Sequence, residues 1–187
     1  DELVLIDTNE AKCTAEFYDL LDSLGRLDTY TKLSMNDYKA LQDADVVITA
    51  FGDIKALADG GNRFLEYSFN CQQAKQVGTA LTEAGFHGVL INISNPCDVI
   101  TGLLQHYTGL SRQQVFGTGT FLDTARMQRA VSMSLDQNPH NIAGYVLGEH
   151  GESQFAAWST ITVQGEPITE IAKDQHLELS ELDKAAR

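Results

Sequence analysis

The chain has 187 residues, of which 43% are hydrophobic and 21% charged, and its formal net charge is −13. These values are ordinary for a soluble globular protein of one domain, or of one domain and part of a second. The sequence contains no run of about 18 apolar residues, so it predicts no membrane span. The acidic net charge argues against binding to nucleic acid or to anionic membranes.

Short apolar segments alternate with helical patterns along most of the chain. Strands are predicted at 3–7, 46–50, 89–93 and 115–120, and helices at 9–24, 64–84, 98–106 and 122–135. Continuous apolar strands separated by helices are typical of a parallel sheet that is covered on both faces. We therefore predict an α/β fold with a doubly wound parallel sheet.

The pattern changes after Asn138-Pro139. Strands at 142–147 and 158–163 follow each other without a helix between them, and a helical pattern runs from 177 to 187. This predicts the start of an α+β domain. We place the boundary near residue 120, so that 1–120 forms the first domain and 121–187 the start of the second.

Both ends of the chain indicate a piece of a longer protein. The first strand begins almost at residue 1, without a Met, and the last helical pattern stops without a C-cap glycine. We expect the first domain to lack its first strand and the second to lack its later elements.

Asp7 ends the first predicted strand. Ligands of doubly wound sheets bind at the carboxyl ends of the strands. An acid there accepts hydrogen bonds from the ribose hydroxyls of NAD and repels the extra phosphate of NADP. The alternative is a capping carboxylate for the helix that follows. The glycine-rich phosphate loop that belongs before such an acid is not in the chain, and we expect it upstream.

Polar residues at three later positions are candidates for chemistry. Asn95, in Ser-Asn-Pro after a strand, can both donate and accept hydrogen bonds, although Asn-Pro also initiates turns. Asp123 and Arg126 share a helix face, where the alternative is a surface ion pair. His150 stands in Gly-Glu-His-Gly after a strand, and flanking glycines let the backbone approach a ligand. A structural histidine is the alternative.

Arg63 opens the helix predicted at 64–84 and follows a segment, 52–62, of little apolar content. Such a segment can act as a mobile lid, and the alternative is a surface loop with a solvated arginine. The three cysteines have no metal-ligand spacing, so we predict no metal site and no disulfide. Reduced thiols favour a cytoplasmic location.

The order of these motifs resembles the lactate/malate dehydrogenase family from about Leu3 to Ile168. The resemblance rests on Asp7, Thr49-Ala50-Phe51-Gly52, Arg63, Ser94-Asn95-Pro96, Leu122-Asp123-Thr124-Ala125-Arg126 and Gly148-Glu149-His150-Gly151. Within the family the chain is most similar to the L-2-hydroxyisocaproate dehydrogenases. That likeness rests on Gly88-Val89-Leu90, Gly117-Thr118-Gly119-Thr120, residues 125–131 and Ser153-Gln154-Phe155.

The resemblance implies a Rossmann-type fold and hydride transfer between NAD(H) and a 2-hydroxy/2-oxo acid. His150 then donates a proton to the 2-oxo oxygen, and Asp123 orients the imidazole. Arg126 binds the substrate carboxylate through two parallel hydrogen bonds. Arg63 polarises the carbonyl and stabilises the charge that develops in the transition state.

The resemblance also implies the cofactor-binding residues. They are Asp7 at the adenosine ribose, with Thr49, Ala50, Phe51, Gly52, Ile93 and Asn95. Asn95 also contacts the substrate. The family is usually dimeric or tetrameric, so we expect a homo-oligomer. The small molecules that it is expected to bind are 2-oxo or 2-hydroxy acids.

A position in the lid separates lactate from malate enzymes of the family. Counting forward from the strand at 46–50 places Ile54 there, and an apolar residue leaves a second substrate carboxylate unpaired. The lid is also about two residues longer than in typical lactate enzymes, which leaves room for a larger substrate. We therefore expect branched or long-chain 2-oxo acids rather than pyruvate. If the lid shifts by one residue, Lys55 serves a dicarboxylate and the protein is a malate dehydrogenase. A non-catalytic NAD-binding module or an inactive fragment is the remaining alternative.

Overall fold

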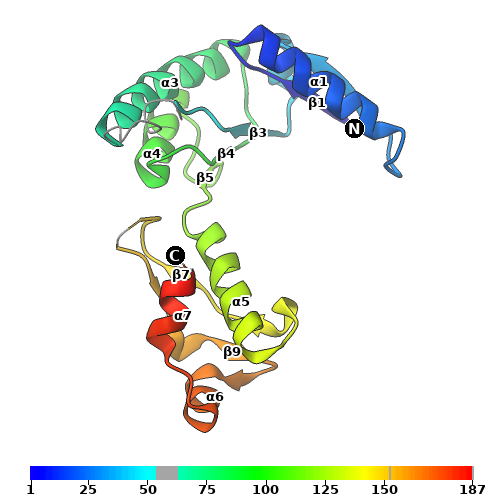
Figure 1. Cartoon of the computed structure of the whole chain (residues 1–187). Helices are drawn as coiled ribbons and strands as arrows, with labels where there is room; N and C mark the ends of the chain where they lie inside the picture. The colour runs from blue at the N-terminus through cyan, green and yellow to red at the C-terminus, as the bar shows by residue number, and fades with distance from the viewer. Residues whose placement is uncertain (54–62, 152, 187) are drawn as a thin grey trace.

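The computed structural model describes residues 1–53, 63–151 and 153–186. Figure 1 shows an amino-terminal part that carries β1 to β5 and a carboxyl-terminal part that begins with α5. The elements of the first part are β1 (Glu2–Leu5), α1 (Glu10–Leu24), β2 (Lys32–Met35), η1 (Tyr38–Asp43), β3 (Val46–Thr49), α3 (Arg63–Ala84), β4 (Val89–Asn92), α4 (Cys97–Thr108) and β5 (Val115–Gly117).

All paired strands of the amino-terminal part run parallel, as predicted. They form two sheets: β1 pairs with β2, and β4 lies between β3 and β5. Because helices connect successive parallel strands, the predicted α/β architecture is confirmed. Strand β2 was not predicted, since its sequence Lys-Leu-Ser-Met has no continuous apolar run.

Helices α3 and α4 pack on the three-stranded sheet and form the first hydrophobic core. Leu90 of β4 and Ile100 and Leu104 of α4 are completely buried, and each such side chain contributes roughly 1.5–3 kcal/mol of burial free energy. The two helices approach closely at Gly78, where an added Cβ would lie 2.6 Å from Tyr107 Cβ. Any larger residue at this position would push the helices apart.

The predicted helix boundaries of this part follow from capping. The Asn9 side chain accepts a hydrogen bond from the Lys12 N–H at 3.1 Å, so α1 begins one residue after it. Helix α4 ends at Thr108, before Gly109, which adopts a left-handed conformation with φ of 66°.

The carboxyl-terminal part has its own hydrophobic core. Its elements are α5 (Phe121–Leu135), η2 (Pro139–Asn141), β6 (Ile142–Ala143), β7 (Val146–Leu147), β8 (Phe155–Ala156), η3 (Trp158–Thr160), β9 (Thr162–Val163), β10 (Glu166–Pro167), α6 (Ile168–Gln175) and α7 (Leu179–Ala186). Met127 and Val131 of α5 and Ile168 of α6 are fully buried in it. Strand β9 lies between β10 and β6, and β7 pairs with β8, all antiparallel.

Two strand predictions in this part need correction. The strand predicted at 142–147 is broken at Gly144, which has a φ of 124° and packs so closely that a Cβ would lie 2.6 Å from Ile161 Cγ1. The prediction of a strand over Trp158–Thr160 was wrong. The Thr160 N–H donates to Ala157 O at 2.8 Å, which closes a 3-10 turn, and strand β9 comprises only Thr162–Val163.

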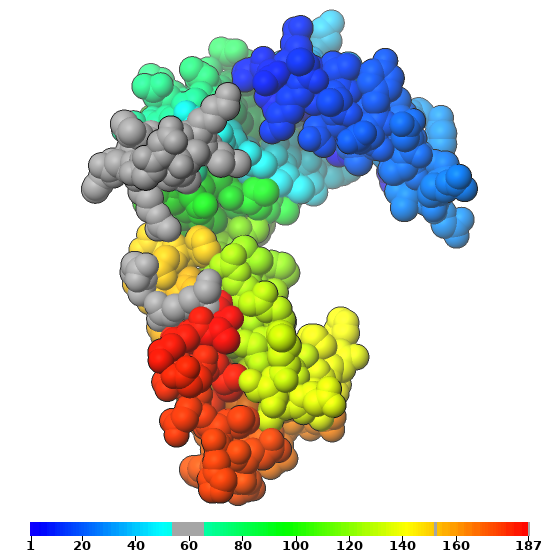
Figure 2. Space-filling view, viewed as in Figure 1, coloured from blue at the N-terminus to red at the C-terminus, as the bar shows by residue number. Residues whose placement is uncertain are grey.

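Residues Thr118 to Thr120 connect the two parts. The Thr118 N–H donates to Asn92 O at 3.1 Å, and the Gly119 N–H donates to Cys97 Sγ at 3.3 Å. Figure 2 shows the amino-terminal part above the carboxyl-terminal part, with the green spheres of the first adjoining the yellow-green spheres of the second on the face in view. Among the described residues, no helix is both long and apolar enough to cross a membrane.

Candidate active site

Helix α5 carries the acidic and basic candidates on one face. Asp123 is 1% exposed, and its Oδ1 accepts a hydrogen bond from Arg126 Nη1 at 3.4 Å. The Arg126 side chain is about one-third exposed, and a guanidinium has further N–H groups besides the one that binds Asp123. The two residues are one helical turn apart, which places them side by side as predicted. The pair is therefore not the exposed surface ion pair of the alternative interpretation.

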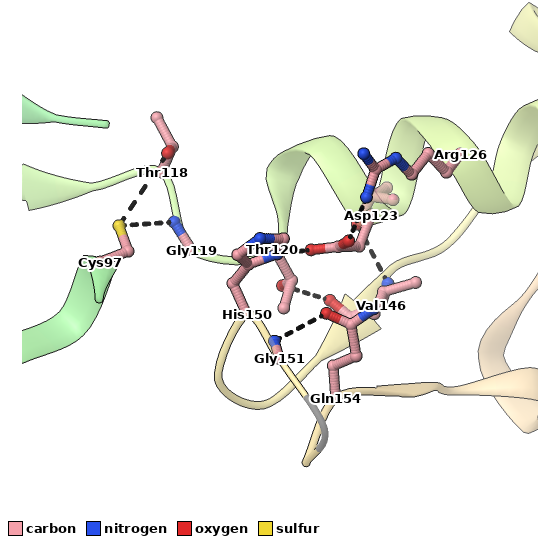
Figure 3. A network of polar contacts seen from close by, with 11 residues as sticks. Cys97, Thr118, Gly119, Thr120, Asp123, Arg126, Val146, His150, Gly151 and Gln154 are labelled. Atoms are coloured by element: carbon pink, nitrogen blue, oxygen red, sulfur yellow. Dashed lines mark hydrogen bonds and ion pairs between the residues drawn. The ribbon is translucent and has the colours of Figure 1, made fainter. Parts of the chain in front are cut away.

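His150 meets the same carboxylate from another element. It follows β7, and His150 Nδ1 lies 2.6 Å from Asp123 Oδ2. A carboxylate can only accept, so Nδ1 carries the shared proton and Nε2 points to the other side of the ring. Figure 3 shows the Asp123 carboxylate between His150 and Arg126. The structure thus brings together three of the predicted residues.

The loop around His150 depends on its glycines. Gly148 has a φ of 96° and Gly151 a φ of 150°, a backbone region that favours glycine. An added Cβ at Gly148 would lie 3.1 Å from Ser153 O. The Gly151 N–H donates to Gln154 Oε1 at 3.2 Å, and Gln154 is itself buried. The loop therefore turns back on itself and presents His150 to α5.

Asp7 lies just beyond the carboxyl end of β1, as predicted. Its Oδ1 accepts the Asn9 N–H at 2.9 Å, and its Oδ2 lies 3.8 Å from Lys12 Nζ. The alternative role, N-cap of the following helix, is wrong, because Asn9 caps α1 and the backbone N–H that Asp7 binds is that of Asn9. A carboxylate has about four acceptor sites, so these contacts do not exhaust it, and the side chain is about one-third exposed.

The segment after β3 combines structural and site positions. Thr49 is buried, and its hydroxyl donates to Asn92 Oδ1 at 3.0 Å. Phe51 packs against the first hydrophobic core, while Ala50 and Gly52 are exposed. Ile54 lies outside the described residues. Arg63 is the first residue of α3, and its side chain is likewise outside the description.

Asn92 is a buried residue that the sequence did not single out. It is 0% exposed, and its Oδ1 also accepts the Ser94 N–H at 3.0 Å. Its Nδ2 donates to Ser94 O, Cys97 O and Thr101 Oγ1, each at 3.1 Å. An Asn within the apolar strand Val-Leu-Ile-Asn-Ile was the available signal, because a buried amide needs partners. Asn92 fixes the loop that carries Asn95.

The end of β4 presents Ile93 and Asn95 to the outside of the sheet. Ile93 is 48% exposed, and the Asn95 side chain is also exposed. Asn70 of α3 holds the Asn95 carbonyl through a 2.6 Å hydrogen bond. Beside them, Asn70 Oδ1 and Ser94 Oγ are buried without a hydrogen-bond partner in the part of the chain that the structure describes.

No cluster of three potential metal ligands occurs in residues 1–53, 63–151 and 153–186.

Comparison with known protein families decides which family the chain belongs to. Residues 1–117 match the model of the lactate/malate dehydrogenase NAD binding domain, and residues 120–185 match the family's alpha/beta C-terminal domain. The chain belongs to the lactate/malate dehydrogenase family. The resemblance seen in the sequence is confirmed, as is NAD as the cofactor of the matched domain.

Individual relatives of the chain are L-lactate dehydrogenases. It is 38% identical over 174 residues to L-lactate dehydrogenase 1 of Bifidobacterium longum, which covers 93% of this chain and 54% of that protein. It is 37% identical over 183 residues to L-lactate dehydrogenase 3 of Bacillus thuringiensis, covering 98% and 57%. The chain therefore spans little more than half the length of these relatives.

Solved structures give the same result for the fold. The ligand-bound minor L-lactate dehydrogenase of Enterococcus mundtii superimposes with a TM-score of 0.92 at 35% identity, covering 100% of this chain and 60% of that one. The finer likeness to L-2-hydroxyisocaproate dehydrogenases, the incomplete ends and the cytoplasmic location stay predictions.

Proposed function

We propose that the whole protein is an NAD-dependent L-2-hydroxyacid dehydrogenase of EC class 1.1.1. The observation that carries this proposal is the 2.6 Å contact between His150 Nδ1 and the buried Asp123 carboxylate. This arrangement leaves His150 Nε2 available for proton transfer, next to an arginine that can bind a carboxylate. A 2-oxo acid has both groups that the site would recognise, a carbonyl oxygen and an adjacent carboxylate.

In this proposal His150 donates a proton to the 2-oxo oxygen as the carbon is reduced, and it takes the proton back in the oxidation direction. Asp123 holds the imidazole in the tautomer and orientation that this requires. Arg126 binds the substrate carboxylate with the guanidinium N–H groups that do not bind Asp123. When bound, NADH supplies the hydride. Arg63 is proposed, from the sequence alone, to polarise the carbonyl.

In this proposal, residues at the strand ends of the amino-terminal part bind NAD. Asp7 has acceptor sites left for the adenosine ribose, and Asn95 and Ile93 are exposed where a nicotinamide carboxamide and ring would contact them. The proposed division at residue 120 separates these residues from the His150 site. It is supported by the two separate hydrophobic cores, one drawn from residues 41–115 and the other from 127–186.

For the substrate we propose a 2-oxo acid with a branched or long apolar side chain. This rests on Ile54 at the lid position that discriminates between lactate and malate enzymes, with L-lactate as the nearest alternative. Malate dehydrogenase activity, through Lys55, remains the second candidate function. We also propose a homo-oligomer, dimeric or tetrameric, by analogy with the family.

The test is NADH oxidation by the whole protein with 2-oxo-4-methylpentanoate, pyruvate and oxaloacetate in parallel. We expect turnover with monocarboxylates and the highest kcat/KM for the branched acid. A preference for oxaloacetate would transfer the specificity role to Lys55. Binding of NADH without turnover of any of the three acids would overturn the enzyme proposal in favour of a binding module.

A further inference from the structure

Strand β7 is attached to helix α5 by two threonine hydroxyls that bind the same residue. Thr120 Oγ1 donates to Val146 O at 2.6 Å, and the Val146 N–H donates to Thr124 Oγ1 at 3.0 Å. One hydroxyl thus serves the carbonyl and the other serves the amide of Val146, and Figure 3 shows the Thr120 contact below α5. We call this arrangement the Val146 clamp.

The Thr124 half of the clamp is buried, whereas the Thr120 half is partly exposed. Val146 is 4% exposed and Thr124 is 8% exposed. Strand β7 has only two residues and a single neighbouring strand, β8. Sheet pairing alone therefore fixes β7 weakly, and the threonine hydroxyls supply the further attachment. A buried N–H that loses its acceptor is costly, so the clamp favours one position of the strand.

The position of the clamp connects it to the chemistry. Thr120 and Thr124 flank Asp123 at the start of α5, and Val146 lies four residues before His150. The same turn of helix therefore holds the Asp123 carboxylate that accepts from His150 and the strand that leads to His150. The far side of the loop is held by the Gly151 N–H to Gln154 Oε1 bond.

We propose that Thr120 and Thr124 are positioning residues that set the distance between His150 and Asp123. This inference rests on the proposed function for its effect on turnover. Because a shift of about 1 Å at a reacting group can lower the rate about a hundredfold, losing the clamp should lower kcat. The substrate KM should change little, since Arg126 is untouched.

The test compares Thr124→Val, which keeps the side-chain shape and removes the oxygen, with Thr124→Ser, which keeps the oxygen. We expect kcat to fall about tenfold to a hundredfold in Thr124→Val and to return close to that of the unaltered protein in Thr124→Ser. NADH affinity should be unchanged in both. Thr108→Val is the matched control, because its hydroxyl donates to Leu104 O within α4 at 2.7 Å, away from the His150 loop.

Thr120→Val with Thr120→Ser provides a second pair if Thr124→Val does not fold. Unchanged kcat in a folded Val variant, or a kcat loss that the Ser variant does not reverse, would overturn the proposal.

If the unaltered protein turns over no 2-oxo acid, the proposed function fails, and the effect of the clamp on the His150–Asp123 contact is then tested without substrate. The readout is then the His150 Nδ1–H proton signal in NMR of the whole protein. Its loss in Thr124→Val but not in Thr108→Val supports the clamp, and its persistence in Thr124→Val overturns it.

Discussion

The candidate site residues are arranged differently in the two parts of the molecule. In the carboxyl-terminal part, Asp123, Arg126 and His150 are in direct contact, and the carboxylate at the centre is 1% exposed. In the amino-terminal part, Asp7, Thr49 and Asn95 stand at or just beyond the ends of three different strands, and each has a different hydrogen-bond partner.

This difference fits the two roles that the proposed function assigns to the two parts. A proton-transfer pair must hold its geometry to fractions of an ångström, which a buried, hydrogen-bonded carboxylate provides. A dinucleotide is long, and its binding residues need only line the strand ends along its length. We therefore expect substitutions in the carboxyl-terminal part to affect turnover and those in the amino-terminal part to affect cofactor affinity.

The largest effect is expected for His150→Gln. Removing the proton donor should lower kcat about a hundredfold to ten-thousandfold, while NADH binding, measured by fluorescence, stays intact. His140→Gln is the matched control, since His140 is exposed on the short turn before β6. Full turnover by His150→Gln would remove His150 from the chemistry.

Asp123→Asn should come next, with kcat lowered about a hundredfold. The amide keeps the volume of the carboxylate but can accept through only one of the two atoms that now bind Arg126 and His150. Asp136→Asn serves as the control. Asp136 is exposed at the end of α5 with a φ of 49°, a conformation that Asn adopts as readily. Equal losses in the two variants would argue against a specific role for Asp123.

The separation of the two parts is tested by core substitutions. Leu104→Ala in the first core and Met127→Ala in the second remove completely buried side chains, and each should cost about 2–5 kcal/mol of unfolding free energy. Amide hydrogen exchange should show that each variant loses protection mainly within its own part. Equal loss across both parts would show that they unfold as one unit.

The smallest effect is expected for Asp7→Asn. Loss of the negative charge should weaken NADH binding about tenfold, the equivalent of one charge-assisted hydrogen bond, with kcat at saturating NADH unchanged. Discrimination against NADPH should fall as well, because the repulsion of its extra phosphate is removed. Asp28→Asn, at an exposed position after α1, is the control. A variant with unchanged affinities would leave Asp7 with only its structural hydrogen bond to the Asn9 N–H.

The sequence predicted the parts of this arrangement that reside in local patterns. Asp123 and Arg126 share a helix face by their spacing, and His150 was identified by its glycines and by resemblance. The supporting residues were missed because their hydrogen bonds connect distant positions: Thr124 binds Val146 and Asn92 binds Thr49. A threonine inside a helix has no local signal that separates a clamp from an ordinary surface position.

The errors in the predicted elements have a similar cause. Trp158–Thr160 has strand composition, but a backbone bond to Ala157 closes it into a turn. Strand β2 pairs with β1 although only two of its four residues are partly buried. In both cases tertiary contacts outweighed the local propensity of the residues.

The central claim is that the Asp123 carboxylate accepts a hydrogen bond from His150 Nδ1. The most direct measurement is NMR of the whole protein with ¹⁵N-labelled histidine, in the absence of NADH and substrate. The account predicts a His150 Nδ1–H proton signal that exchanges slowly with water and disappears in Asp123→Asn. Absence of this signal, or its persistence in Asp123→Asn, would contradict the account.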